Sequence, residues 1–224
     1  MAGDNVNYWT SAHDPATVAA SGCSERLLNV PRAEEQSAPP PASEENDWLS
    51  AAQNGDRAAF ARVVTAYWDR MFRWLFHMTH DRHRAEDLTQ ETFLKALAAI
   101  KSFRVGSNFR AWLYRIAHNN FVNLKRGDKR RAGTLPDESL TADDAPGPVH
   151  QAEDRETLKR VTDAIAQLPS DFRTALLLRA DEGMNFRDIA AVLGITEETA
   201  RWRVFKARQK LVKSIGNDEP EEPE

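Results

Sequence analysis

The apolar side chains of this 224-residue chain recur at steps of three and four within two separate blocks. Steps of this size place side chains on one face of an α-helix. No stretch alternates with a period of two, and no hairpin turn separates β-branched runs. The pattern therefore predicts an all-α protein. In the first block, the residues expected to be buried are Phe60, Val63, Val64, Tyr67, Met71, Trp74, Leu75 and Met78 on one helix, Leu88, Phe93, Leu94, Leu97 and Ile100 on the next, and Phe109, Trp112, Leu113, Ile116 and Leu124 on the last.

Residues that begin and end helices divide each block into short elements. Asp47 can cap a first helix that ends near Gly55. Asp56 and Asp81 can cap the next two helices, and the last one of this block is expected to start near Asn108. In the second block, helices are expected at about 155–167, 171–182, 186–193 and 197–213.

Charge is distributed unevenly along the chain, whose formal net charge is −4. Residues 47–131 carry 16 basic and 8 acidic side chains, and residues 155–213 carry 12 and 8. The acidic, proline-containing stretches around these blocks bury too little apolar surface to offset chain entropy. Basic domains on acidic connectors suggest a polyanionic partner. The expected organisation is a disordered acidic extension at 1–46, a helical domain at 47–127, a flexible acidic linker at 128–154, a second small helical domain at 155–213 and a disordered acidic tail at 214–224.

Several classes of protein are disfavoured by what the sequence lacks. No run approaches the ~18 apolar residues of a membrane helix and no apolar signal core is present, so we expect a cytoplasmic protein without membrane insertion. The one cysteine, Cys23, falls in the expected disordered extension and is a poor candidate nucleophile. His77, His80 and His83 cannot converge on a metal, because the outer pair lies about 240° apart on a helix. A glycine-rich phosphate loop is also lacking, which disfavours an NTPase. We expect no enzyme and no metal or other cofactor.

The most informative motif is a helix-turn-helix near the C-terminus. Phe186, Ile189 and Leu193 form one apolar face, and Gly194 suits the left-handed residue that ends a helix. Thr196 can cap the following helix. This plan places the second helix in the major groove of DNA, where arginine can pair with guanine and other basic groups hold phosphates. The alternative, a basic helix that only solvates a bundle, is disfavoured by the turn residues. The second helix carries Arg201, Arg203, Lys206, Arg208, Lys210 and Lys213 against Glu197 and Glu198.

A second basic stretch, residues 101–131, mixes nine basic side chains with aromatic and amide groups. Basic groups can hold a nucleic-acid backbone, and aromatic faces stack on unpaired bases at ~1–3 kcal/mol each. The mixture suits a surface that captures single-stranded or flipped bases. The alternative is that Phe109 and Trp112 belong to the core, which their spacing with Leu113 and Ile116 supports.

Segments of both blocks resemble the small bacterial sigma factors of the extracytoplasmic-function (ECF) type. AEDLTQETFLKAL at 85–97 and FRAWLYRIAHNNFVNLKR at 109–126 look like their domain 2, and residues 168–211 look like their domain 4. The ordered pair, with an acidic linker between, is highly specific. The resemblance implies a subunit that binds the β′ clamp and β flap of core RNA polymerase, recognises promoter −10 and −35 elements and helps to open the DNA. It also allows an anti-sigma factor as a partner.

The resemblance further assigns roles to single positions. A polar stripe on one helix matches the motif that docks on the clamp, and such a stripe can pair with a basic partner helix. The implied polymerase-binding residues are Asp87, Gln90, Glu91 and Phe93. The expected −10 residues are Phe103, Asn108, Arg110, Trp112, Tyr114, Arg115, Asn119, Lys125 and Arg126. The expected −35 residues are Thr196, Glu198, Thr199, Arg201, Trp202, Arg203, Lys206 and Arg208.

Three residues of the second helix depart from the family's usual pattern. Ala200 stands where a β-branched residue is common, and Trp202 and Phe205 stand where polar residues are frequent. These departures leave the −35 sequence unpredicted. An alternative function is a helix-turn-helix regulator that binds duplex DNA without polymerase. Against it, the N-terminal block is too small and too basic for a ligand-binding or receiver domain.

Overall fold

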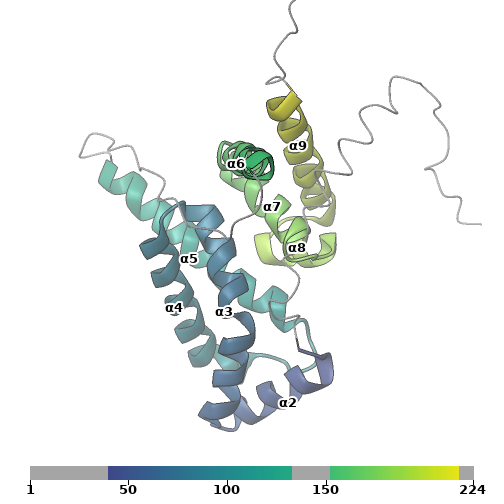
Figure 1. The fold of residues 1–224 in the computed structure, drawn as a ribbon. Helices are drawn as coiled ribbons and strands as arrows, with labels where there is room; N and C mark the ends of the chain where they lie inside the picture. Colours follow the sequence, from purple (N-terminus) through teal and green to yellow (C-terminus); the bar gives the residue numbers. More distant parts are fainter. Residues whose placement is uncertain (1–39, 133–151, 217–224) are drawn as a thin grey trace, which may run out of the picture. The chain divides into compact units, whose positions relative to one another are not determined.

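The computed structural model describes residues 40–132 and 152–216, which contain helices and no strands (Figure 1). The prediction of an all-α protein is confirmed for these residues. None of the described helices is both long enough and apolar enough to cross a membrane. The first bundle contains α2 (Ala42–Gln53), α3 (Arg57–Thr79), α4 (Arg82–Ala99), the short 3₁₀ helix η1 (Ile100–Ser102) and α5 (Phe109–Ala132). The second bundle contains α6 (Ala152–Ala166), α7 (Ser170–Ala180), α8 (Phe186–Leu193) and α9 (Glu197–Gly216).

Two helix ends extend past the expected boundaries of the first domain. Helix α2 begins at Ala42, inside the stretch expected to be a disordered extension. Glu44 and Glu45 lie in its first turn, where acidic side chains are favourable against the helix dipole. The Tyr67 hydroxyl also donates a hydrogen bond to Glu45, which ties this first turn to α3. Helix α5 continues to Ala132, so its last turn occupies the start of the expected linker. Helix α6 begins at Ala152, inside the expected linker, and α9 ends at Gly216, inside the expected tail. Residues 1–39, 133–151 and 217–224 lie outside the described residues.

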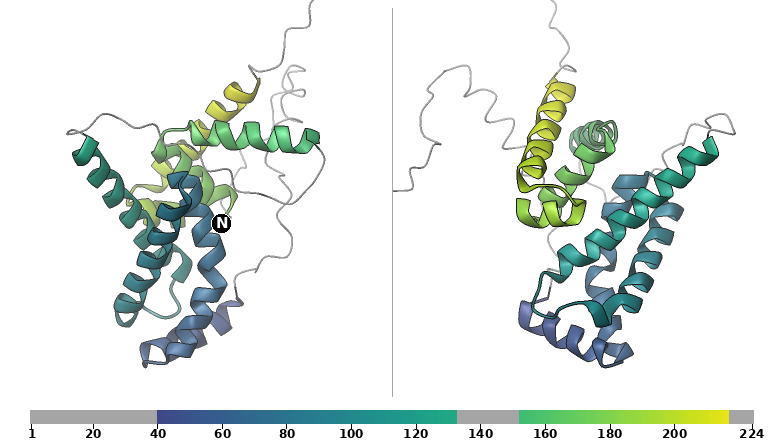
Figure 2. Two further views of the ribbon diagram at one scale, coloured as in Figure 1. Left: turned by 60° about the vertical axis from the view of Figure 1, so that its left-hand side comes forward. Right: turned by 180° about the vertical axis from the view of Figure 1, so that it is seen from behind.

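The apolar face of α3 forms the centre of the first bundle, as its spacing predicts. Met71 and Leu75 are fully buried, and the ring of Trp74 packs edge-on against Tyr114 of α5 at 5.3 Å. Tyr67 makes a similar contact with Phe109 at 5.6 Å. Helices α3, α4 and α5 lie side by side in every view (Figure 1 and Figure 2).

The inner face of α4 is narrower than predicted and is built mostly from small residues. Leu88 and Phe93 are buried as expected. The expectation that Leu94 and Leu97 are buried is wrong, because these side chains are 68% and 42% exposed. Small side chains allow neighbouring helices to approach closely, so α4 needs fewer large residues to fill its contact with α3 and α5. The small residues of the inner face are Ala85, Thr89, Thr92 and Ala96.

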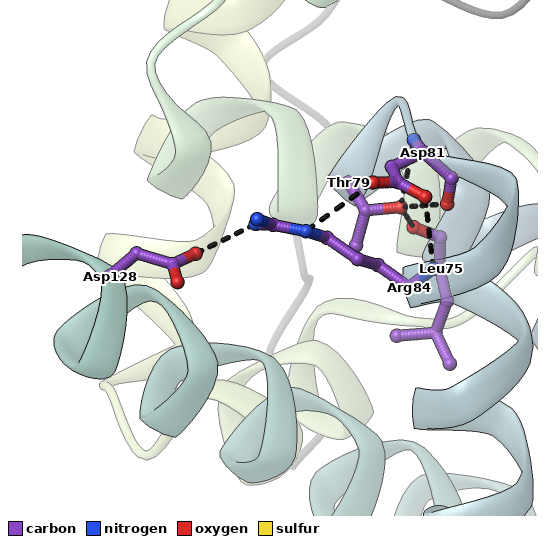
Figure 3. A network of polar contacts seen from close by, with 5 residues as sticks. All are labelled: Leu75, Thr79, Asp81, Arg84 and Asp128. Carbon is purple, nitrogen blue, oxygen red and sulfur yellow. Dashed lines mark hydrogen bonds and ion pairs between the residues drawn. The ribbon is translucent and has the colours of Figure 1, made fainter. Parts of the chain in front are cut away.

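A polar corner fixes the end of α3, the start of α4 and the last part of α5 (Figure 3). The Thr79 hydroxyl donates to the carbonyl oxygen of Leu75 at 2.9 Å and accepts from the backbone N–H of Asp81 at 3.3 Å. Asp81 caps α4, as predicted, by accepting from the N–H of Arg84 at 3.0 Å. The Arg84 guanidinium then pairs with Asp128 of α5 at 2.8 Å. Thr79, Asp81 and Arg84 together therefore connect the three helices.

The second bundle confirms the helix-turn-helix. Asn185 caps α8 by accepting from the N–H of Asp188 at 2.8 Å. Gly194 ends α8 in the left-handed conformation, with φ 66°, where a side chain would be strained. Thr196 then accepts from the N–H of Thr199 at 3.2 Å at the start of α9. The turn is thus set by residues whose backbone preferences are visible in the sequence.

Substituting Asp81→Ala should lower the free energy of unfolding by about 1 kcal/mol, because it removes the N-cap hydrogen bond of α4. Chemical denaturation followed by circular dichroism measures this loss. Asp69→Ala is the matched control, since Asp69 is exposed in the middle of α3 and should change stability by less than about 0.5 kcal/mol. Equal losses in both variants would contradict the capping role.

Candidate nucleic-acid interface

Helix α9 turns most of its basic side chains toward solvent. Ala200, Val204 and Ala207 are buried and hold the helix against the second bundle. The opposite arc is free to meet a partner and carries the side chains expected to read duplex DNA. Of the expected −35 residues, Thr196, Glu198, Arg201, Trp202 and Arg208 are exposed, and Thr199, Arg203 and Lys206 are half-buried.

Arg201 is held in place at the first turns of α9. Its guanidinium carbon lies 5.0 Å from the centre of the Phe186 ring, and one of its nitrogens pairs with Glu197 at 3.2 Å. The guanidinium carbon of Arg179 also lies 5.1 Å from the same ring, while this side chain donates to the carbonyl oxygen of Met184 at 2.8 Å. Cation–π contacts of this kind restrict a flexible arginine. Arg201 is therefore partly preorganised beside the turn.

Arg203 has a different environment from Arg201. Its side chain is only 21% exposed and pairs with Asp171 at the start of α7 at 3.1 Å. This contact links α9 to α7 inside the second bundle. Arg203 therefore has a structural partner already, and its expected contact with DNA stays a prediction.

The expected −10 residues of α5 fall on more than one face. Phe109 is buried, which confirms its alternative assignment to the core, and it packs against Trp112 at 5.6 Å. Trp112 keeps a partly exposed edge and also contacts Phe103 at 5.1 Å. Asn119 is exposed, whereas its neighbour Asn120 is buried. The other exposed members of the set are Arg115, Lys125 and Arg126.

Two polar side chains of α2 fix the loop between η1 and α5. Gln53 donates through Nε2 to the carbonyl oxygens of Ile100, at 2.9 Å, and Phe103, at 2.6 Å. Asn46 accepts from the N–H of Gly106, which has φ 86°. The sequence analysis did not identify Gln53 or Asn46, because their partners are some 50 residues away in the chain. Within the loop, Asn108 caps α5 as expected by accepting from the N–H of Ala111 at 3.0 Å, and buried Phe103 lies beneath the loop.

Arg110 and Tyr114 contact the loop that follows α7. The Arg110 guanidinium donates to the carbonyl oxygen of Glu182 at 2.9 Å, and Arg70 pairs with the Glu182 carboxylate at 3.0 Å. Tyr114 is fully buried, and burial together with the nearby Glu182 carboxylate raises its pKa well above the usual value. In this arrangement Tyr114 cannot reach DNA. Its −10 role stays a prediction that requires Glu182 to move away.

The expected polymerase-binding residues lie on the outer side of α4, with one difference. Asp87, Gln90 and Glu91 are exposed in a row. Phe93 is buried instead and stacks on Trp68 at 5.8 Å, so it supports this surface from beneath. The exposed side chain of Leu94 takes its place at the surface. We call the exposed row of Asp87, Gln90, Glu91, Leu94 and Leu97 the α4 stripe.

A polar chain leads from the α4 stripe to α5. The Lys95 ammonium pairs with Glu91 at 2.6 Å and donates to Asn120 Oδ1 at 2.6 Å. Asn120 in turn donates through Nδ2 to the Thr92 hydroxyl at 3.2 Å. These contacts satisfy the buried amide of Asn120, as a buried polar group requires. They also connect the Glu91 carboxylate of the α4 stripe to Asn120, the residue that follows Asn119.

Arg173 joins the end of α3 to the start of α7 through buried polar contacts. Its guanidinium donates to the carbonyl oxygens of Leu168 at 3.0 Å and His77 at 3.3 Å, and lies 2.6 Å from His80 Nε2. Burial lowers the pKa of both histidines, and Arg173 lowers them further by repelling their charged forms. His118 of α5 also has a pKa lowered by burial. The described residues contain no cluster of three metal-ligating side chains.

The histidine contribution to folding stability should therefore decline as the pH falls below ~6.5, where histidines of the unfolded chain bind protons that the folded state excludes. Asp181 opposes this decline in part, because burial raises its pKa to about 6 and the folded state then binds a proton that the unfolded chain does not. Urea denaturation at pH 7.5 and 5.5 measures the decline. His77→Gln should make the decline smaller. His83→Gln, a change of an exposed histidine, should leave it unaltered. The same pH dependence in the wild type and both variants would show that burial of His77 does not govern it.

Comparison with known proteins gives two family matches in the same order as the two bundles. The model for Sigma-70 region 2 matches residues 63–131, and the model for Sigma-70, region 4 matches residues 158–211. The RNA polymerase sigma-H factor of Pseudomonas aeruginosa is 37% identical over 179 residues, which are 75% of this chain and 91% of that protein. The ECF RNA polymerase sigma factor SigM of Bacillus subtilis is 34% identical over 152 residues, 66% of this chain and 90% of that protein.

Solved structures show the same arrangement of helices. The sigma factor RpoE of Bartonella quintana, solved in complex with the anti-sigma factor NepR, matches with a TM-score of 0.60 and 28% identity. That match covers 71% of this chain and 98% of the solved one. CnrH, solved in complex with the cytosolic domain of CnrY, has a TM-score of 0.61 at 24% identity and covers 79% of this chain and 99% of its own, which shows a shared fold.

Proposed function

The chain belongs to the ECF group of sigma-70 factors, and on that premise we propose that it binds core RNA polymerase and directs it to promoters. One observation carries the proposal. A bundle that exposes basic, aromatic and amide groups on α5 precedes a helix-turn-helix whose second helix exposes basic groups. These two surfaces suit an opened strand and a duplex, respectively. A helix-turn-helix regulator that acts without polymerase is not favoured. Such a regulator would not require a Sigma-70 region 2, and residues 63–131 match the model for that region.

The α4 stripe is the proposed contact with the β′ clamp of the polymerase. It combines carboxylates and an amide with the exposed side chains of Leu94 and Leu97. Acidic groups suit a basic partner surface, and exposed leucines that gain cover on binding supply the hydrophobic contribution. The second bundle is the proposed contact with the β flap, on the strength of family membership.

The exposed groups of α5 and the adjoining loop are the proposed −10 surface. Arg115, Lys125 and Arg126 can hold the phosphate backbone, and the partly exposed Trp112 ring can contact an unpaired base. Asn119 can read a base edge through its amide. Unstacking a base costs a few kcal/mol, and stacking returns ~1–3 kcal/mol per base. Capture of unpaired bases therefore shifts the equilibrium from closed to open promoter without any bond chemistry in this chain.

The outer arc of α9 is the proposed −35 surface. Arg201 is preorganised next to the turn, where helix-turn-helix proteins present side chains to base edges. Arg208 and Lys206 can hold phosphates. Because both bundles contact phosphates, promoter affinity should fall steeply with salt. Two modest DNA contacts in one chain reinforce each other once both are docked on the same polymerase.

The reaction catalysed by the complex belongs to the polymerase, and we propose no enzymatic activity, metal or cofactor for this chain. Its place is the bacterial cytoplasm, because its proposed partners are the polymerase and the chromosome. An anti-sigma factor is a further proposed partner. The Bartonella relative that crystallised with such a factor supports this, since it shares the fold at 28% identity.

Run-off transcription of a fragmented genomic library, with core RNA polymerase in the presence and absence of this protein, tests the proposal directly. We expect new, discrete start sites, each preceded by the same pair of sequence elements. The shared elements would identify the −35 and −10 motifs together. Absence of new starts at low salt would reject the initiation function and favour the regulator alternative.

Asn119→Ala should slow promoter opening by on the order of tenfold while promoter binding stays near normal, because one base contact of ~1–3 kcal/mol is lost. Permanganate reactivity of unpaired thymines measures opening, and a mobility-shift titration measures binding. Asn123→Ala is the matched control, an exposed amide one turn further along α5. Normal opening by Asn119→Ala would remove Asn119 from the −10 surface.

A further inference from the structure

Two large aromatic side chains are exposed on the helix proposed to read the −35 element. Trp202 is 51% exposed and Phe205 is 55% exposed. Neither completes the core of the second bundle, which is closed on this side by smaller residues of α9. Exposed aromatic groups of this size in an otherwise basic surface suggest contact with a partner. The partner that α9 offers on the present proposal is duplex DNA.

Both residues are attached to the arc of α9 that faces away from the bundle, and the ring of Trp202 leans back to contact α7. Ala200, Val204 and Ala207 are buried and mark the inward direction. At about 100° per residue, Trp202 lies roughly 200° around the helix from Ala200, and Phe205 roughly 140°. Trp202 is therefore close to the middle of the outward arc. It also lies in the first half of α9, the part that such helices present to base edges.

Contacts with neighbouring residues restrict the Trp202 side chain. Its ring packs against Phe172 of α7 at 5.6 Å, and Phe172 is itself packed against the core. The next residue, Arg203, is tied to Asp171 by the ion pair at 3.1 Å. Lys206 lies 5.8 Å from the centre of the Phe205 ring. The contact with Phe172 restricts the Trp202 ring, so that less side-chain entropy remains to be lost when it binds.

Among the four bases, thymine is the one whose major-groove edge fits an aromatic pair. It presents a C5-methyl group for apolar contact and the O4 acceptor, whereas guanine, adenine and cytosine carry no methyl group. The indole of tryptophan offers an apolar body and a single N–H donor, which can donate to O4. Phosphates and the other three bases offer no methyl group to an apolar ring face.

We propose that Trp202, with Phe205 beside it, recognises thymine in the −35 element through the C5-methyl group. This inference rests on the proposed function, and it names the chemical group that the second bundle reads. It explains why the two side chains that depart from the family's polar pattern are both apolar and both exposed. Arg201 and Lys206 then supply the polar contacts on either side.

The test removes the methyl group alone. A duplex with a randomised −35 segment is selected with the full chain bound to core polymerase, and each selected thymine is then replaced by deoxyuridine. We expect about fourfold weaker binding at one or two positions, the effect of losing one buried methyl-sized group at ~0.8 kcal/mol. Replacement at the other thymines should have no effect.

Protein variants then assign the methyl group to its reader. Trp202→Ala should bind the thymine and deoxyuridine duplexes equally, whereas Lys210→Ala, a change of an exposed basic residue of α9, should weaken both and keep their ratio. Thermal unfolding of Trp202→Ala checks that this variant folds. The deoxyuridine measurements on the wild-type protein test the proposal without any variant.

The outcomes separate the two proposals. No penalty at any thymine, or the same penalty in Trp202→Ala, would overturn thymine reading even if promoter binding is strong. Binding to core polymerase or to a protein partner that is lost in Trp202→Ala, without a deoxyuridine penalty, would assign the aromatic pair to protein contact instead. Absence of promoter-dependent binding altogether would reject the proposed function and this inference with it.

Discussion

A helix that both closes a core and meets a partner must divide its circumference between the two tasks. On α9, buried Ala200, Val204 and Ala207 hold the helix to its bundle, and the larger side chains face outward. Helix α4 follows the same plan, with small residues such as Ala85 and Ala96 inside. Small inner residues bring each helix close to its neighbours and leave the opposite arc open. The proposed binding surfaces are thus positioned by core packing, and their rigidity is that of the bundles.

Most features set by local chemistry could be predicted from the sequence, but the expected cap Asp47 is wrong, because α2 begins at Ala42 and Asp47 lies inside it. The caps formed by Asp56, Asp81 and Thr196, and the left-handed Gly194, depend only on residues within one turn, and all four have their expected roles. The long apolar row of α3 is equally clear, because its side chains repeat over about five turns on one face. The helix-turn-helix could be located for the same reason.

Features that depend on distant residues could not be predicted. The apolar arc of α4 is wide enough to include Leu94 and Leu97, and only the packing of neighbouring helices shows that they face outward. The sequence does not distinguish Asn119 from Asn120, whereas the structure buries the second against Lys95 and Thr92. The burial of Tyr114 and the contacts of Glu182 join residues far apart in the chain, and no local pattern signals them.

The separation of inner and outer arcs on α9 has a consequence for how such proteins diverge. Side chains on the outer arc make few contacts with the core, so substitutions there change stability little and combine nearly additively with changes elsewhere. The small inner residues can stay constant while the outer arc varies. If α9 reads the −35 element as proposed, a lineage that retains this bundle can acquire new sets of target genes by a few surface substitutions, without first evolving a new scaffold.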